Sequence, residues 1–167
     1  MENKKIFACL IFACSSSAFA GEGNGFYVGG GLASTAVEQD VCSDCTTSGV
    51  AVEGGYTFNR VVDIDAKIST TDSDNYDYTL DMQYLGVNIG TDFGTKIFRL
   101  YGKIGYAHTV IEEPGYTDGS DSNVAYGIGA RFTFGERKGV YIKLESIATE
   151  FLGDSVGAGT LSVGYQF

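Results

Sequence analysis

The sequence predicts an all-β protein that folds as an eight-stranded antiparallel up-and-down transmembrane β-barrel. The first observation behind this prediction is a strict alternation of large apolar residues with small or polar ones, which places the two kinds on opposite faces of a strand. The second is a composition of 24 Gly, 11 Tyr and 11 Phe with a single Pro. The third is that no helical periodicity interrupts the alternation.

The N-terminus has the pattern of a signal peptide. An apolar run, 6–13, follows two lysines and precedes Ala18-Phe19-Ala20, a small-x-small cleavage pattern. This run is too short for a spanning helix, which needs about 20 residues. We therefore expect a signal peptide at 1–20 and one barrel domain at 21–167. A lipoprotein with a lipid on Cys14 is the alternative, although the residues before Cys14 fit that motif poorly.

Eight segments after the signal alternate in period two, and each reaches the roughly 9 to 11 residues of a tilted spanning strand. They are 25–36, 48–58, 61–71, 80–93, 97–111, 123–135, 139–149 and 157–167. In 48–58 Val52 and Tyr56 face away from Glu53, and in 61–71 Ile64 faces away from Asp65.

The later segments continue the alternation. Leu100 opposes Arg99 in 97–111, Ile128 opposes Gly129 in 123–135, and Leu144 opposes Glu145 in 139–149. In the last segment four large apolar residues share one face and Ser162, Gly164 and Gln166 share the other; the four are Leu161, Val163, Tyr165 and Phe167. We expect the apolar face of every segment to contact lipid.

The connections between these segments alternate in length. Short turns at 59–60, 94–96 and 135–139 contrast with longer polar connections at 37–47, 72–79, 112–122 and 150–156. Short turns on one side and long loops on the other are typical of an even-stranded membrane barrel with both termini on the short-turn side.

A soluble barrel of the lipocalin type would have the opposite arrangement, with apolar residues inside and polar residues outside. In this sequence we assign every ionised strand residue to the face that holds the glycines, and every bulky apolar residue to the other face. This distribution favours the membrane barrel.

Four pieces of the chain resemble a known family. They are Gly25–Gly31, Leu100–Tyr106, Tyr126–Phe132 and Gly164–Phe167. They are similar to the small eight-stranded barrels of the outer membrane protein A and X type, in the outer-membrane β-barrel domain family. The resemblance implies a monomer in the bacterial outer membrane, reached by export through the periplasm, with membrane lipid and lipopolysaccharide as its surroundings. It also implies that the barrel assembly machinery reads the last strand at Leu161, Val163, Tyr165 and Phe167.

Nine charged residues are expected to point into the lumen. They are Glu53, Asp63, Asp65, Lys67, Arg99, Lys103, Arg131, Lys143 and Glu145. Because an unpaired buried charge is costly, we expect these side chains to pair and close the lumen, with Arg131 and Glu145 as one candidate pair. A narrow porin-like pore that opens when the pairs break is the alternative.

The outer connections are acidic. They contain no Lys or Arg, and Asp72, Asp74 and Asp77 mark a stretch where weak, diffuse binding of divalent cations is conceivable. Solvated loops that need no ligand are the simpler interpretation. Cys42 and Cys45 lie in the first outer connection, and we expect a small structural disulfide there rather than a zinc or redox site.

No catalytic residues are expected. Lipid A deacylases among outer-membrane barrels use a His followed two residues later by Ser, whereas His108 is followed by Val110. A partner Ser from a distant segment is conceivable, but an interface role for His108 is favoured. We expect a non-enzymatic protein without a cofactor or a dedicated metal site, acting in adhesion, binding of an extracellular ligand or envelope stability. The net charge of −10 argues against a nucleic-acid partner. A lipid A-modifying enzyme is the least favoured alternative.

Overall fold

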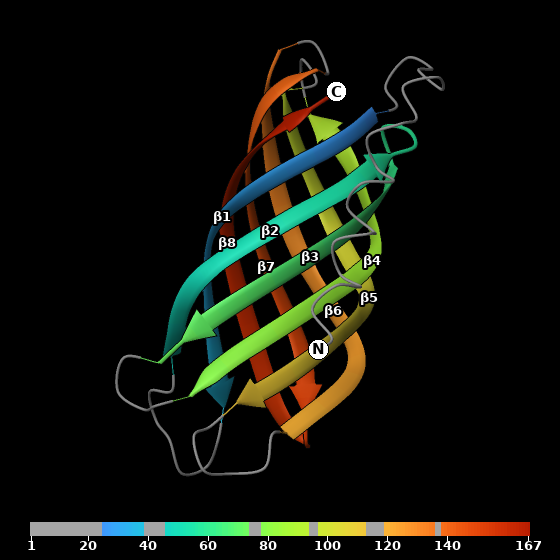
Figure 1. Ribbon diagram of the computed structural model, residues 1–167. Coiled ribbons are helices and arrows are strands. Elements are labelled where there is room, and N and C mark those ends of the chain that lie inside the picture. Colours follow the sequence, from blue (N-terminus) through green and yellow to red (C-terminus); the bar gives the residue numbers. More distant parts are fainter. Residues whose placement is uncertain (1–24, 39–45, 74–77, 94–96, 113–118, 136–137) are drawn as a thin grey trace, which may run out of the picture.

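The computed structural model describes residues 25–38, 46–73, 78–93, 97–112, 119–135 and 138–167. This part of the chain forms a closed antiparallel barrel in which each strand pairs with the next in sequence and the first pairs with the last (Figure 1). The predicted fold class is therefore confirmed. Among these residues no helix has the length and apolar character needed to cross a membrane.

The strands are β1 (Gly25–Glu38), β2 (Thr46–Thr57), β3 (Val62–Asp72), β4 (Thr79–Phe93), β5 (Phe98–Glu112), β6 (Gly119–Phe134), β7 (Gly139–Phe151) and β8 (Asp154–Gln166). We call the end of the barrel where β1 starts and β8 stops the terminal end, and the opposite end the loop end. The C-terminus lies at the top of Figure 1, so the terminal end is uppermost there. At the terminal end the strand limits match the predicted segments to within one residue.

At the loop end the strands run further than predicted. The largest difference is at 150–156, which we expected to be a long loop. Instead, Phe151 pairs with Asp154, and only Leu152 and Gly153 form the turn between β7 and β8. Both turn residues have positive φ, 51° and 96°, as a two-residue type I′ hairpin turn requires. The polar residues that suggested a loop belong to paired strands.

The outer face of the barrel is apolar over most of its length. Ile128, Leu85 and Tyr126 are 64–70% exposed, which is the expected state of side chains that contact lipid. The last strand follows the same rule, because Leu161, Val163, Tyr165 and Phe167 are all exposed while Ser162 and Gln166 are buried. Near the terminal end, aromatic rings on the outer face contact one another across strands, as Phe98 and Phe132 do at 4.5 Å between centroids.

Toward the loop end this pattern of faces reverses, and here the sequence-based expectation was wrong. Large apolar side chains point inward and form a cluster that includes Leu80, Met82, Ile147, Phe151 and Val156. On the outer face of the same region the exposed or half-exposed residues are polar, among them Ser34, Ser48, Thr70, Gln83, His108 and Ser122. The loop end is thus built like a small soluble barrel, with an apolar interior and a polar surface.

Inward tyrosines explain several glycines of the barrel wall. Tyr101 of β5 lies opposite Gly129 of β6, and a Cβ atom on Gly129 would overlap its ring. Tyr141 lies against Gly164 of β8 in the same way. These glycines leave the space into which the aromatic rings of neighbouring strands fold.

Candidate functional site

The nine charged residues predicted to face the lumen all lie inside the barrel. Each is between 1% and 5% exposed, and each takes part in at least one ion pair, across five strands. Two groups can be distinguished. The central cluster contains Glu53, Asp65, Lys67, Lys103, Lys143 and Glu145, and the terminal group contains Asp63, Arg99 and Arg131.

The central cluster balances three carboxylates with three ammonium groups. Lys143 Nζ lies 2.8 Å from Glu53 Oε2, 3.0 Å from Asp65 Oδ2 and 3.3 Å from Glu145 Oε1. Lys103 Nζ lies 3.0 Å from Asp65 Oδ2 and 2.7 Å from Glu145 Oε1. Lys67 pairs with Glu145 and approaches Glu53 at 3.8 Å. Every charge in this cluster therefore has at least one opposite charge within reach.

Hydroxyl groups add further hydrogen bonds to the central cluster. Tyr101 donates to Glu145 Oε1 at 2.8 Å, while Tyr141 and Ser162 both donate to Glu53 Oε1 at 2.9 Å. Lys67 Nζ also donates to Thr160 Oγ1 at 2.7 Å. These bonds offset part of the cost of moving charges out of water, because buried ion pairs are stable only when their remaining donors and acceptors are also used.

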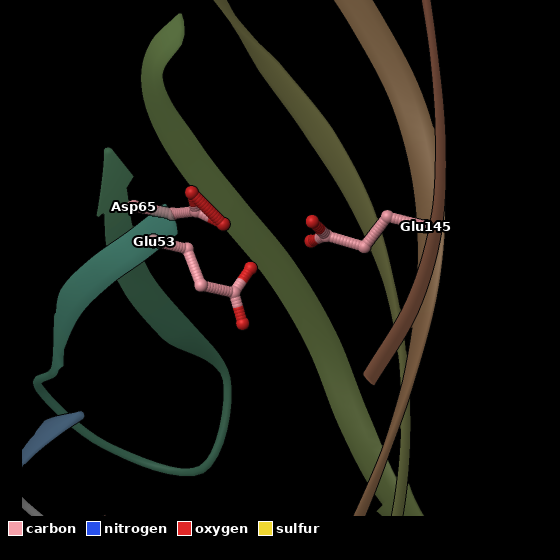
Figure 2. A group of neighbouring side chains, drawn as sticks. All are labelled: Glu53, Asp65 and Glu145. Carbon is pink, nitrogen blue, oxygen red and sulfur yellow. The ribbon is translucent and has the colours of Figure 1, made fainter. Parts of the chain in front are cut away.

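Three carboxylates of this cluster converge, as Figure 2 shows, with Glu145 facing Glu53 and Asp65 across the lumen. One oxygen from each lies within 4.8 Å of the others, which is a spacing that could hold a metal ion. The same carboxylates, however, already bind the ammonium groups of Lys67, Lys103 and Lys143. A metal ion would have to displace three cations, so the donor set fits an ion-pair cluster better than a metal centre.

The terminal group lies nearer the terminal end of the barrel, where β1 starts and β8 stops. Arg99 Nη1 pairs with Asp63 Oδ2 at 2.9 Å, and Arg131 Nη2 reaches the same oxygen at 3.6 Å. The guanidinium of Arg131 also lies 5.2 Å from the ring centroid of Tyr27. Arg131 and Glu145, suggested as a pair by the sequence, belong to different groups and do not bond to each other.

The apolar cluster at the loop end was not anticipated. The sequence pattern that indicates this cluster lies in 79–93, where Leu80, Met82 and Tyr84 alternate with Asp81, Gln83 and Leu85. Large residues occur on both faces of that segment, so periodicity alone could not assign the inner one. The central cluster and this apolar layer thus place buried side chains at two successive levels of the described lumen.

Of the remaining predicted residues, Asp72 and His108 are described. Asp72 is exposed, and its Oδ1 accepts a hydrogen bond from Thr79 Oγ1 at 2.8 Å. Asp74, Asp77, Cys42 and Cys45 fall outside the described residues. His108 has Val110 two positions later, as noted above, but pairing of β5 with β6 brings its Nδ1 to 2.8 Å from Ser122 Oγ on the outer face.

Comparison with known proteins agrees with this architecture. The family model of the outer membrane protein beta-barrel domain matches residues 6–167. No curated protein sequence matches the chain. Among solved structures, Ail, the attachment invasion locus protein of Yersinia pestis, aligns with a TM-score of 0.67 and 20% identity, covering 88% of this chain and 100% of that one.

Two further structures are similar at lower identity. Neisserial surface protein A aligns with a TM-score of 0.65 and 15% identity, covering 87% of this chain and 98% of its own. The outer membrane protein OprG from Pseudomonas aeruginosa aligns with a TM-score of 0.60 and 14% identity, covering 87% and 96%. At these identities the likeness concerns the fold.

Proposed function

The chain belongs to the outer membrane protein beta-barrel domain family, and from that premise we propose that it is a non-enzymatic barrel with a closed lumen. Membership places it in the bacterial outer membrane as a small eight-stranded barrel. We further propose that its outward end contacts other molecules at the cell surface, in adhesion or in stabilising the envelope. The observation that carries the closed lumen is that each of the nine buried charges takes part in at least one ion pair inside the barrel.

The orientation follows from family topology. Short turns and both termini of such barrels face the periplasm, and the longer connections face outward. The terminal end is then periplasmic. We propose that residues 1–20 are removed during export, and that the barrel assembly machinery reads the exposed apolar row of β8, which consists of Leu161, Val163, Tyr165 and Phe167.

Closure has two independent supports. Breaking a buried ion pair by removing one partner typically costs about 3–5 kcal/mol, so spontaneous opening of the central cluster is unfavourable. Beyond that cluster, Leu80, Phe151 and Val156 fill the lumen with side chains that are 1–4% exposed, and an apolar constriction excludes hydrated ions. Both features oppose the alternative of a porin-like ion channel.

The outward end supports a role in surface contacts. Asp72, Glu112 and Glu150 are exposed near the ends of their strands, and the connections 39–45, 74–77 and 113–118 contain no Lys or Arg. An acidic surface of this kind attracts basic partners or divalent cations. The name of the similar Yersinia pestis protein, attachment invasion locus protein, refers to attachment, and an adhesive role for this chain is consistent with it.

Planar-bilayer conductance tests the closed lumen. We expect the refolded protein to give no stable conductance steps. The double variant Glu53→Ala with Lys143→Ala keeps the charge balance but removes side-chain volume from the central cluster only, and we expect the apolar layer to keep it closed as well. Stable steps from the unmodified protein would refute closure and favour the channel.

Surface function needs a separate experiment. Cells displaying the protein should bind a panel of immobilised matrix and serum proteins more than cells displaying Asp72→Asn, Glu112→Gln, Glu150→Gln. Equal binding, together with equal resistance to detergent, would refute the surface role. Mass analysis of lipid A with and without the protein tests the enzymatic alternative, and we expect identical spectra.

A further inference from the structure

We propose that the periplasmic mouth of the barrel binds a small tetrahedral oxyanion of the phosphate class, held by Arg99 and Arg131. This site is separate from the central cluster, whose three ammonium groups are already matched by three carboxylates. It goes beyond the proposed function, because closure of the lumen does not require a ligand at its end.

The first support is the arrangement of the two arginines. Arg99 of β5 and Arg131 of β6 are direct cross-strand partners in the ladder, and like charges in directly opposite positions repel. Both guanidinium groups turn to one carboxylate oxygen, Asp63 Oδ2, at 2.9 and 3.6 Å. A single carboxylate oxygen thus serves two buried cations, which is too little negative charge to satisfy both.

The second support is a set of unused donors. Arg99 is 4% exposed, yet its Nε and Nη2 have no hydrogen-bond partner. Thr57, cross-strand neighbour of Asp63, has a buried hydroxyl that also lacks a partner. Buried donors without acceptors are costly. A tetrahedral oxyanion offers several acceptor oxygens in the geometry that the guanidinium fork recognises.

The charges around the site include one competitor. Asp92 of β4 is the direct cross-strand partner of Arg99, on the side opposite Arg131. Within the described residues Asp92 forms no ion pair, although it lies on a strand adjacent to a buried cation. Lys143 of β7 is the direct cross-strand partner of Arg131, but it binds Glu53 and Asp65 of the central cluster. Asp63 keeps one carboxylate oxygen without a hydrogen-bond partner, and Tyr27 and Thr57 are uncharged hydroxyls. Asp92 therefore weakens the proposed site electrostatically without filling it.

Access to the site comes from the periplasm. Arg99 is the second residue of β5, Asp63 the second of β3, Thr57 the last of β2 and Arg131 the fourth from the end of β6. Asp92 at the same end is partly exposed. From outside the cell, the apolar layer and the central cluster obstruct the route. The two arginines therefore lie nearer to the periplasmic rim of the barrel than to its outer rim.

The test uses the full barrel refolded in zwitterionic detergent, with inorganic phosphate as the probe. We expect titration calorimetry to show binding of phosphate, and the thermal midpoint to rise in phosphate above its value in sodium chloride of equal ionic strength. Arg99→Gln and Arg131→Gln should each weaken binding at least tenfold. Lys138→Gln removes an exposed charge at the same end and should bind like the unmodified protein. Asp92→Asn should bind more tightly.

Heat-dependent mobility on gels shows whether each variant folds, and Arg131→Lys covers the case in which a glutamine variant does not. Arg131→Lys keeps the positive charge but loses the two-pronged guanidinium group, so its affinity for phosphate should fall between that of the unmodified protein and that of Arg131→Gln. Three results would overturn the proposal. They are a phosphate effect no larger than that of chloride, an equal loss in Lys138→Gln, and weaker binding in Asp92→Asn, which would make Asp92 part of the mouth's own structure.

Discussion

Tyr101 links the packing of the barrel wall to the charges of the lumen. Its hydroxyl donates to Glu145 at 2.8 Å, so its ring cannot move freely from the space over Gly129. We expect Gly129→Ala to destabilise the barrel by about 1–3 kcal/mol, the usual cost of overpacking. Urea unfolding in detergent measures this. Gly102→Ala is the control, because a Cβ there would meet nothing closer than 4.0 Å; an equal effect of both changes would contradict the explanation.

Gly129 also shows what alternation cannot reveal. The sequence assigns it correctly to the inner face and suggests that a serine there would be tolerated. The structure contradicts that tolerance, because Tyr101 from the neighbouring strand occupies the space. Which side chain fills the gap beside a glycine depends on strand register, and register is set by pairing that a single sequence does not display.

A second residue-scale prediction concerns how the lumen charges are coupled. Glu145→Gln alone should cost about 3–5 kcal/mol, because three lysines lose a partner. In a double-mutant cycle, Glu145→Gln and Lys67→Met should show an interaction energy of about 0.5–3 kcal/mol, whereas Glu145→Gln and Arg131→Gln should be nearly additive. Unfolding free energies of the four proteins in each cycle provide the measurement. Additivity between positions 145 and 67 would rule out their pairing.

The residue types of the lumen were predictable, and their pairing was not. Charged residues on the glycine face must be buried if the other face contacts lipid, and all nine are. Their separation into a balanced cluster and a group with two arginines to one aspartate depends on the relative heights of the strands. Arg131 and Glu145 lie on adjacent strands, but the register places Arg131 opposite Lys143 and Glu145 opposite Gly129.

At the scale of elements, the β7–β8 turn gives a further prediction. Leu152 has φ of 51° and is 69% exposed, a conformation in which a leucine is strained and asparagine or glycine is favoured. Leu152→Asn should therefore stabilise the barrel by about 0.5–1 kcal/mol in urea unfolding. Gly153→Ala, at φ of 96°, should have the opposite sign. A loss of stability in Leu152→Asn would show that contacts of the exposed leucine side chain stabilise the barrel by more than the backbone strain at this position destabilises it.

The same turn marks the limit of predicting elements from sequence. At the terminal end, aromatic and glycine residues change abruptly to turn residues, and the predicted limits match. At the loop end, Glu150 and Asp154 look like loop residues because they are charged, yet both belong to strands. Polar residues on the outer face indicate contact with water. Because water surrounds both a loop and a strand that extends beyond the membrane, polarity alone cannot distinguish the two.

At the scale of the whole molecule, the reversal of faces indicates where the membrane ends. On β1 the outer face changes from apolar to polar within two residues, from Leu32 to Ser34, and on β5 it changes from Tyr106 to His108. Inside the barrel, charged side chains give way toward the loop end to the apolar cluster. A charge facing lipid at mid-membrane costs about 2–4 kcal/mol, whereas one beyond the apolar row costs little.

This boundary leads to a prediction about insertion. Ile128→Arg should impair folding into lipid vesicles by about 2–4 kcal/mol, because Ile128 is 70% exposed within the apolar part of the outer face. Ser120→Arg, on the same strand and the same face but beyond the boundary, should fold like the unmodified protein. The folded fraction can be followed by heat-dependent gel mobility. Equal impairment of both variants would place Ser120 within the membrane and contradict the boundary.

The boundary can also be measured directly, because the chain contains no tryptophan. A single tryptophan at position 104, 106 or 108 of β5 is then the only indole in the protein, and these positions share the outer face. Two residues along a strand tilted by about 40° change depth by about 5 Å. In vesicles of lipid brominated deep in the acyl chain, Ile104→Trp should be quenched most, Tyr106→Trp less and His108→Trp least, with red-shifted emission. The same order should hold on β1 for Leu32→Trp before Ser34→Trp. Equal quenching at 104 and 108 would mean that the polar outer row lies within the hydrocarbon, where its hydroxyl and imidazole groups would have to find partners other than water.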